Sequence, residues 1–246
     1  IRRAPGKAQA EAPRPLTTYG REEFKNMNAF AWANDVKDKL EKEFADRLVF
    51  VGLQGSRARG EAREDSDIDL VVLLNHIDAS DLERYRTIIQ AMPYSELACG
   101  FVGSKDALAA WPRHELFQFY HDTKALLGAL LEIEPFTKDD AIKAAHIGAS
   151  GIYHATCHAF VFDDDPANDI LKSLFKSAFF TLQALQFTRT GSYPCTKEEL
   201  ARQLEGDEAR ILEIGRNWQE HQPIGNKEQL ELVNLLLHWS EKILLD

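Results

Sequence analysis

Two aspartates and a glycine-serine pair lie close together near residue 60 of the 246-residue chain. The run Gly55-Ser56-Arg57-Ala58-Arg59-Gly60 is separated by six residues from Asp67-Ile68-Asp69. Residues 66–74 are typical of a strand, in which side chains alternate between faces, so both carboxylates would point the same way, about 7 Å apart. Such a pair is unfavourable unless a cation compensates it. Hard carboxylate oxygens suit Mg²⁺, which binds one or two protein carboxylates together with substrate phosphates.

The glycine-serine pair suits a phosphate group. A turn at Gln54-Gly55-Ser56 would let backbone N–H groups approach phosphate oxygens closely, and the Ser56 hydroxyl adds a donor. Arg59 offers a planar, charged fork for phosphate oxygens. Alone, Gly-Ser is usually a turn and Asp-x-Asp a solvated strand edge, but their joint occurrence in this order favours phosphoryl or nucleotidyl transfer.

The run GSRARGEAREDSDIDLVV resembles the signature of the DNA polymerase β-type nucleotidyltransferase superfamily, and no P-loop pattern is present. The resemblance implies that a nucleotide is held by the first part of the run and one or two Mg²⁺ ions by its two aspartates. An acceptor hydroxyl would then attack the α-phosphorus of ATP, the substrate, and pyrophosphate would leave. The implied nucleotide-binding residues are Gly55, Ser56, Arg59 and Ser66, and the implied catalytic and metal-binding residues include Asp67 and Asp69.

The superfamily usually has a third carboxylate on a later strand. In this chain the strand predicted over 95–102 offers Glu96, which we take as the third catalytic and metal-binding residue. A surface glutamate at a strand end explains the same residue equally well. If Glu96 has no such role, the helical half could supply the general base from Glu132, Glu134 or His158, and the sequence does not choose among them.

The predicted secondary structure differs between the two halves of the chain. Apolar periodicity predicts a helix over 30–44 and another over 80–92, alternating with strands over 48–51, 66–74 and 95–102. After Pro135 only helical patterns occur, over about 137–160, 166–189, 208–220 and 226–244. We therefore predict an α+β fold, with a small mixed sheet followed by an all-α bundle. The expected parts are a flexible N-terminal arm over 1–27, a nucleotidyltransferase domain over 28–125 and a helical bundle domain over 136–246.

The bundle resembles the HEPN or KNTase-like helical domain that accompanies nucleotidyltransferase domains of antibiotic-modifying enzymes. Arg216 and His221 match the spacing of HEPN ribonucleases, a pattern that also arises easily by chance. His154 and His158 lie one helical turn apart without the surrounding residues of a zinc motif. The lysines at 172 and 176 could reach triphosphate oxygens, although a solvated helix face is the simpler interpretation.

The amino-acid composition limits the kinds of molecule that the chain is expected to bind. A net charge of −10 disfavours duplex nucleic acid and is compatible with a cationic small substrate. No uncharged apolar run is long enough for a membrane span. Three cysteines without a CxxC pair indicate a reducing, cytoplasmic setting.

The expected function is therefore Mg²⁺-dependent transfer of a nucleoside monophosphate, AMP from ATP, to a hydroxyl of a small acceptor such as an aminoglycoside-like antibiotic. The alternative is a fused nucleotidyltransferase–HEPN regulatory module of the toxin–antitoxin kind, acting on a protein or RNA. A non-catalytic nucleotide binder is a third hypothesis. The sequence leaves open whether the chain forms a homodimer.

Overall fold

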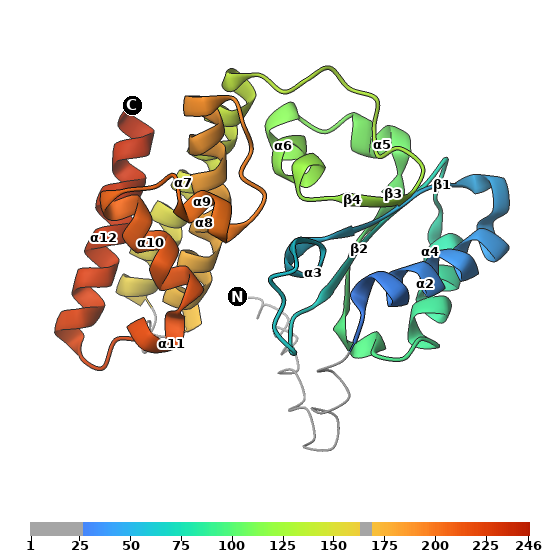
Figure 1. Cartoon of the computed structure of the whole chain (residues 1–246), viewed down its shortest axis with the longest axis horizontal. Helices are drawn as coiled ribbons and strands as arrows, with labels where there is room; N and C mark the ends of the chain where they lie inside the picture. Colours follow the sequence, from blue (N-terminus) through green and yellow to red (C-terminus); the bar gives the residue numbers. More distant parts are fainter. Residues whose placement is uncertain (1–26, 163–168) are drawn as a thin grey trace, which may run out of the picture.

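The computed structural model describes residues 27–162 and 169–246, arranged as two lobes side by side (Figure 1). The sheet lobe, residues 27–127, contains a four-stranded sheet of order β3-β2-β1-β4. β1 (Leu48–Gln54) is antiparallel to β2 (Ile68–Leu74) and to β4 (Lys124–Leu127), whereas β3 (Ala98–Ser104) runs parallel to β2. The sheet is therefore mixed, as predicted.

Alternating strand residues bury both faces of the sheet. On one face, Leu53, Leu70 and Val72 pack under α2 (Ala29–Phe44) and α4 (Ala79–Gln90). On the other, Phe50, Val71 and Leu73 pack with Leu108 and Leu116 of the short helices α5 (Lys105–Ala109) and α6 (Arg113–His121). Because both faces are covered, the strands read as nearly continuous apolar runs.

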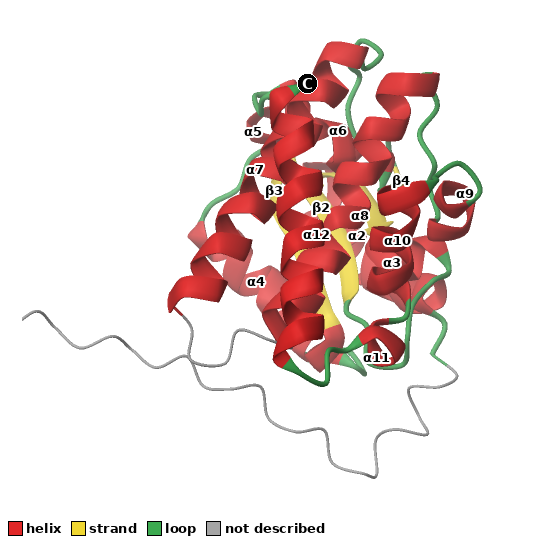
Figure 2. Ribbon diagram, turned by 90° about the vertical axis from the view of Figure 1, so that its left-hand side faces the viewer, coloured by secondary structure: helices red, strands yellow, loops and turns green. Residues whose placement is uncertain are grey.

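The helical lobe, residues 138–162 and 169–246, is all helical in its described part (Figure 2). Its long helices are α7 (Lys138–Phe162), α8 (Asp169–Thr190), α10 (Gly206–Arg216) and α12 (Asn226–Leu245), and its short ones are α9 (Lys197–Ala201) and α11 (Trp218–His221). The predicted helix over 208–220 is two helices, because Asn217 leaves the helical region with φ −119° and ψ 45°. The α+β prediction is confirmed.

Helix α6 connects the two cores. Leu116 belongs to the core beneath the sheet, whereas the next residue, Phe117, belongs to the core of the helical lobe. The Phe117 ring contacts Phe136 and Phe187 edge to face at centroid distances of 5.4 and 5.1 Å. Consecutive residues of one helix therefore anchor both lobes.

Several boundaries differ from the sequence prediction. The turn expected at 54–56 is the start of α3 (Gly55–Arg59), and β2 begins at Ile68, after Ser66 and Asp67. A 3₁₀ turn, η2 (Ser95–Leu97), precedes β3, so Glu96 lies outside the strand. The predicted arm over 1–27 lies outside the described residues, except for Met27. Among described helices, none combines the length and apolarity needed to cross a membrane.

Candidate active site

Gly55 and Asp69 are packed against each other at the end of β1. Gln54, the last residue of β1, pairs with Asp69 in the β1–β2 ladder, so the next residue lies beside the Asp69 side chain. Gly55 has φ +74°, and a Cβ built there would collide with Asp69 Oδ2. Glycine is therefore required twice, for its backbone conformation and for the space that the carboxylate occupies.

Asp67 and Asp69 form an electrostatically unfavourable pair. Asp67 is exposed and directly precedes β2, while Asp69 is half-buried as the second residue of that strand. Burial raises the pKa of Asp69, and the negative charges of Asp67 and Asp122 raise it further. A bound cation would relieve this repulsion between carboxylates.

Asp122, which the sequence analysis did not single out, completes this acidic group. It follows α6, is buried, and accepts the Gly55 backbone N–H through Oδ2 at 3.2 Å. A cavity of about 320 Å³ opens between the lobes at this point. Its lining comprises Gln54, Gly55, Asp69, Glu115, Gln118, Phe119, Asp122 and Phe180.

Arg59 is engaged by carboxylates. Its Nη1 is paired with Asp122 Oδ1 and its Nε with Glu61 Oε2 at 3.1 Å. The guanidinium also stacks over Phe179 and Phe180 of α8, 5.2 and 5.9 Å from the ring centroids. These contacts join α3 to the helical lobe, and a phosphate would have to compete with them for Arg59.

The loop that carries Asp67 is held by Arg57, a buried residue with an unpredicted positioning role. Arg57 Nη2 donates to the Ser66 carbonyl at 2.7 Å, and its Nε donates to the Asp67 carbonyl at 3.2 Å. The Ser66 hydroxyl accepts the Arg63 backbone N–H at 2.8 Å. Ser66 therefore stabilises the loop before β2, while Ser56 lies half-buried in α3.

Glu96 is not brought together with the two aspartates. It is exposed in η2, two residues before Ala98, the residue that pairs with Ile68 across the sheet. β3 itself reads ACGFVGS and carries no carboxylate. Within residues 27–162 and 169–246 no three or more His, Cys, Asp or Glu side chains are grouped to hold a metal ion.

The other candidate bases and ribonuclease residues are dispersed. Glu132 and Glu134 lie in the segment between β4 and α7. His158 lies on α7 with its ring 5.1 Å from that of Phe162. Arg216 ends α10 and accepts a hydrogen bond from Arg63 through its carbonyl, whereas His221 ends α11 and lines a separate cavity.

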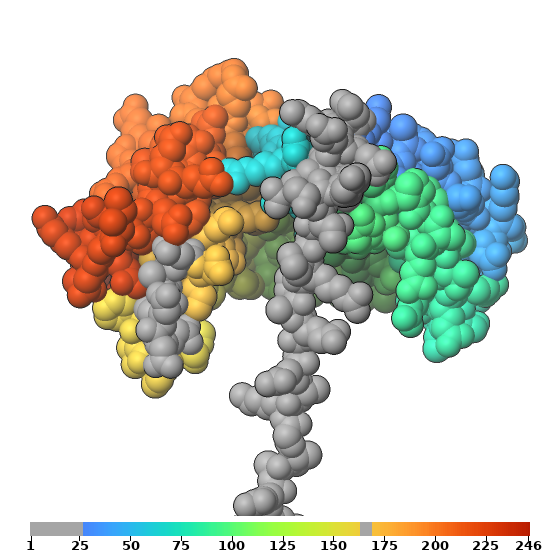
Figure 3. Space-filling model, turned by 90° about the horizontal axis from the view of Figure 1, so that it is seen from below, coloured from blue at the N-terminus to red at the C-terminus, as the bar shows by residue number. Residues whose placement is uncertain are grey.

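Two lysines of the helical lobe, Lys176 and Lys197, interact electrostatically with residues of this site. The pKa of Asp69 is raised by burial and by the neighbouring acids, and the positive charge of Lys176, on α8, partly opposes that rise. Lys197, at the start of α9, is half-buried, and burial together with the charges of Arg59, Arg63 and Lys176 lowers its pKa. In Figure 3 the cyan segment that follows β1 lies between the two lobes, next to the orange helices.

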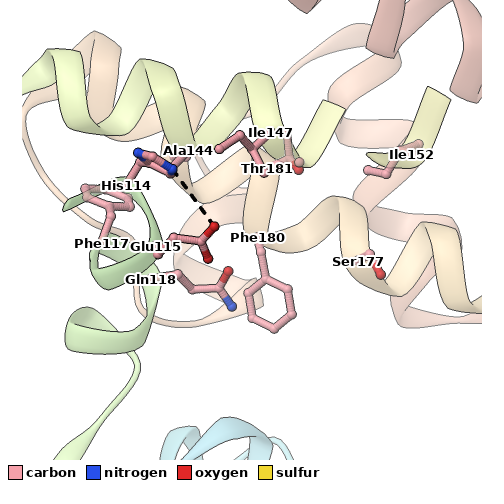
Figure 4. Close-up of a pocket in the computed structure, with 12 residues that line it drawn as sticks. His114, Glu115, Phe117, Gln118, Ala144, Ile147, Ile152, Ser177, Phe180 and Thr181 are labelled. Carbon is pink, nitrogen blue, oxygen red and sulfur yellow. Dashed lines mark ion pairs between the residues drawn. The ribbon is translucent and has the colours of Figure 1, made fainter. Parts of the chain in front are cut away.

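A second cavity, of about 250 Å³, lies between α6, α7 and α8 (Figure 4). Its wall combines apolar side chains such as Phe117, Ile147 and Ile152 with the hydroxyls of Ser177 and Thr181. Helix α6 contributes His114, Glu115 and Gln118. It therefore offers an amphipathic pocket beside the acidic group.

The residues present fit a divalent cation in one respect. Asp67 and Asp69 supply hard oxygen donors, and a bound cation would compensate the burial and the charge repulsion that together raise the pKa of Asp69. The open cavity beside Asp69 leaves space for the phosphates that Mg²⁺ usually shares with its protein ligands.

Comparisons with known proteins agree with this arrangement. Residues 34–95 match the family described as nucleotidyltransferase domain. No curated protein matches the chain. Among solved structures, spectinomycin adenyltransferase AAD(9) from Enterococcus faecialis, determined with ATP and spectinomycin, has a TM-score of 0.54 at 13% identity, covering 88% of this chain and 99% of that one. Residues 34–95 of the sheet lobe thus match a nucleotidyltransferase domain, and the two-lobed fold is similar to that of the spectinomycin adenyltransferase.

Proposed function

We propose that the chain is a Mg²⁺-dependent nucleotidyltransferase that moves AMP from ATP to a hydroxyl of a small acceptor and releases pyrophosphate. The observation that carries this proposal is the packing of Gly55 against Asp69, with Asp67 beside it, inside the matched domain. A glycine that leaves room for a carboxylate, at the mouth of an open cavity, is expected where a polyphosphate approaches the backbone.

Asp67 and Asp69 would hold Mg²⁺, which when bound neutralises phosphate charge and makes the α-phosphorus easier to attack. Lys176, whose charge acts on Asp69, and Lys197, whose charge interacts with those of Arg59 and Glu61, would hold the outer phosphates. Most of the rate would come from positioning the two substrates and from stabilising developing charge.

The cavity between α6 and α8 would receive the acceptor. Its mixture of apolar wall and hydroxyl groups suits a ring-shaped, hydroxylated molecule. The net charge of −10 favours an acceptor that carries amino groups. Spectinomycin, which was bound in the similar solved enzyme, is therefore the first acceptor to test.

The test is transfer of label from α-³²P-ATP with Mg²⁺ to a panel of aminoglycosides and related antibiotics. We expect labelled acceptor with the wild-type chain and none with Asp67→Asn combined with Asp69→Asn. Asp65→Asn changes an exposed acid of the same loop and serves as the matched control. Transfer that survives the double substitution would refute the mechanism, and label on a protein instead of the antibiotic would favour the regulatory alternative.

A further inference from the structure

The two cavities between the lobes meet at one short stretch of wall. Glu115, Gln118 and Phe180 line both the cavity at Asp69 and the cavity between α6 and α8. An acceptor in the second cavity must therefore present its reacting hydroxyl to the first at these three side chains. Of the three, only Glu115 can take up a proton at neutral pH.

The position of Glu115 suits contact with a bound molecule. Its side chain is 54% exposed, and Figure 4 shows its carboxylate directed into the cavity beside Gln118. The neighbouring imidazole of His114 places its Nε2 3.9 Å from Glu115 Oε1, beyond hydrogen-bond distance. A carboxylate held this loosely retains the lone pairs that a substrate hydroxyl needs.

The neighbouring acids are less suitable for this task. Asp122 lines the same cavity, but its two oxygens already accept hydrogen bonds from Arg59 and from the Gly55 N–H. Asp67 and Asp69 are the donors proposed for the metal. The neighbouring strand β3 has no carboxylate, so it cannot supply the general base.

We propose, on the basis of the function proposed above, that Glu115 is the general base for the acceptor hydroxyl. The hydroxyl proton moves to Glu115, and the oxygen electron pair forms the bond to the α-phosphorus. The bond from that phosphorus to the bridging oxygen breaks, and its electron pair leaves with pyrophosphate. Glu115 then returns the proton to solvent, so that charge and atoms balance over one turnover.

The test compares Glu115→Gln with Glu96→Gln, using Glu83→Gln on the exposed face of α4 as a control. Steady-state kinetics with ATP and the best acceptor of the panel give kcat and the acceptor KM, while calorimetry gives the Kd values of Mg-ATP and acceptor. For Glu115→Gln we expect kcat to fall about 10²–10⁴-fold, the usual contribution of a general base. Both Kd values and the melting temperature should stay close to wild type, because glutamine keeps the shape of the side chain.

Two results would overturn the inference. One is unchanged kcat in Glu115→Gln, including the case in which only the acceptor KM rises, because Glu115 would then bind the acceptor without taking its proton. The other is a loss of kcat in Glu96→Gln that matches or exceeds the loss in Glu115→Gln. Failure of the proposed function is distinguishable, since the wild-type chain would then transfer no label to any acceptor.

Discussion

The guanidinium of Arg59 and the carboxylate of Asp122 form an ion pair in which the side chains are only 7% and 6% exposed. Asp122 also accepts the Gly55 N–H, so this pair links the glycine beside Asp69 to the end of α6. Burial raises the pKa of Asp122, and the positive charge of Arg59 opposes that effect. The pair thus holds Gly55 and the end of α6 in place at the candidate active site.

Arg59→Gln should lower the free energy of unfolding by about 3–5 kcal/mol, because it leaves Asp122 buried without a counter-charge. Urea denaturation measures the change. Arg202→Gln, which removes an exposed pair with Glu198, should cost no more than about 1 kcal/mol. In a double-mutant cycle, Arg59→Gln with Asp122→Asn should cost less than the sum of the single changes. Additive losses would contradict the pairing.

Gly55→Ala and Gly60→Ala separate backbone strain from occupied space. Both glycines have positive φ, +74° and +77°, so either alanine should cost about 1–2 kcal/mol of stability. Only at position 55 would the new Cβ displace Asp69, since Gly60 has open space around it. We expect Mg-ATP affinity, measured by calorimetry, to fall at least about tenfold (1.4 kcal/mol) in Gly55→Ala alone. Equal losses in both variants would show that the contact with Asp69 is unimportant.

Asp69→Asn should stabilise the protein in the absence of ligands while abolishing transfer. The folded state raises the pKa of Asp69, so at neutral pH its ionised form costs more in the folded than in the unfolded chain. Removing this cost should raise Tm. Thermal unfolding with and without Mg-ATP tests both effects, and the ligand-induced rise in Tm should disappear. A lower Tm in the free variant would contradict this account.

Lys176→Gln should weaken ATP binding more than Lys172→Gln. Both lysines are exposed on α8, but only the charge of Lys176 is found acting on Asp69. We expect the Kd of Mg-ATP to rise about three- to tenfold for Lys176→Gln, equivalent to about 0.6–1.4 kcal/mol. Calorimetry at two salt concentrations should show a smaller salt dependence in this variant. Equal affinities for the two variants would remove Lys176 from the site.

His121 should make the protein sensitive to acid. Burial lowers the pKa of His121 to about 4, and its ring stacks on Tyr193 at 4.4 Å. Above about pH 6.5 the imidazole is neutral in both states, whereas between about 6.5 and 4 the unfolded chain binds a proton that the folded chain resists. His121→Phe should therefore lose less stability over this range, by about 1–2 kcal/mol after allowance for partial exposure. Urea titrations at several pH values measure it, and identical slopes in variant and wild type would exclude the effect.

The sequence predicted what depends on local pattern. The strand through Ile68–Leu74 and the long helices of the second half follow from apolar periodicity, and Gly55 was singled out from its neighbours alone. The packing of Gly55 against Asp69 depends on the register of β1 and β2, in which Gln54 pairs with Asp69.

The sequence did not predict what depends on α6. The first predicted domain ends at residue 125 with no strand predicted after 102, so Asp122 and the strand β4 went unrecognised. Asp122 sits among aromatic residues with no pattern of its own, and its importance arises only when Arg59 is brought to it from 63 residues earlier in the chain. Glu115 was not predicted either, because its position in the wall of both cavities depends on the tertiary structure and not on a local sequence pattern.

Helix α6 also restricts how far the two lobes can move apart. Because Leu116 and Phe117 are embedded in different cores, swinging the lobes apart would pull one of these side chains out of its packing. Exposing the Phe117 ring alone would cost about 1.5–3 kcal/mol, before its edge-to-face contacts are counted. Wide hinge opening is thus penalised, and under the proposed function nucleotide and acceptor would enter and leave through the open sides of the two cavities.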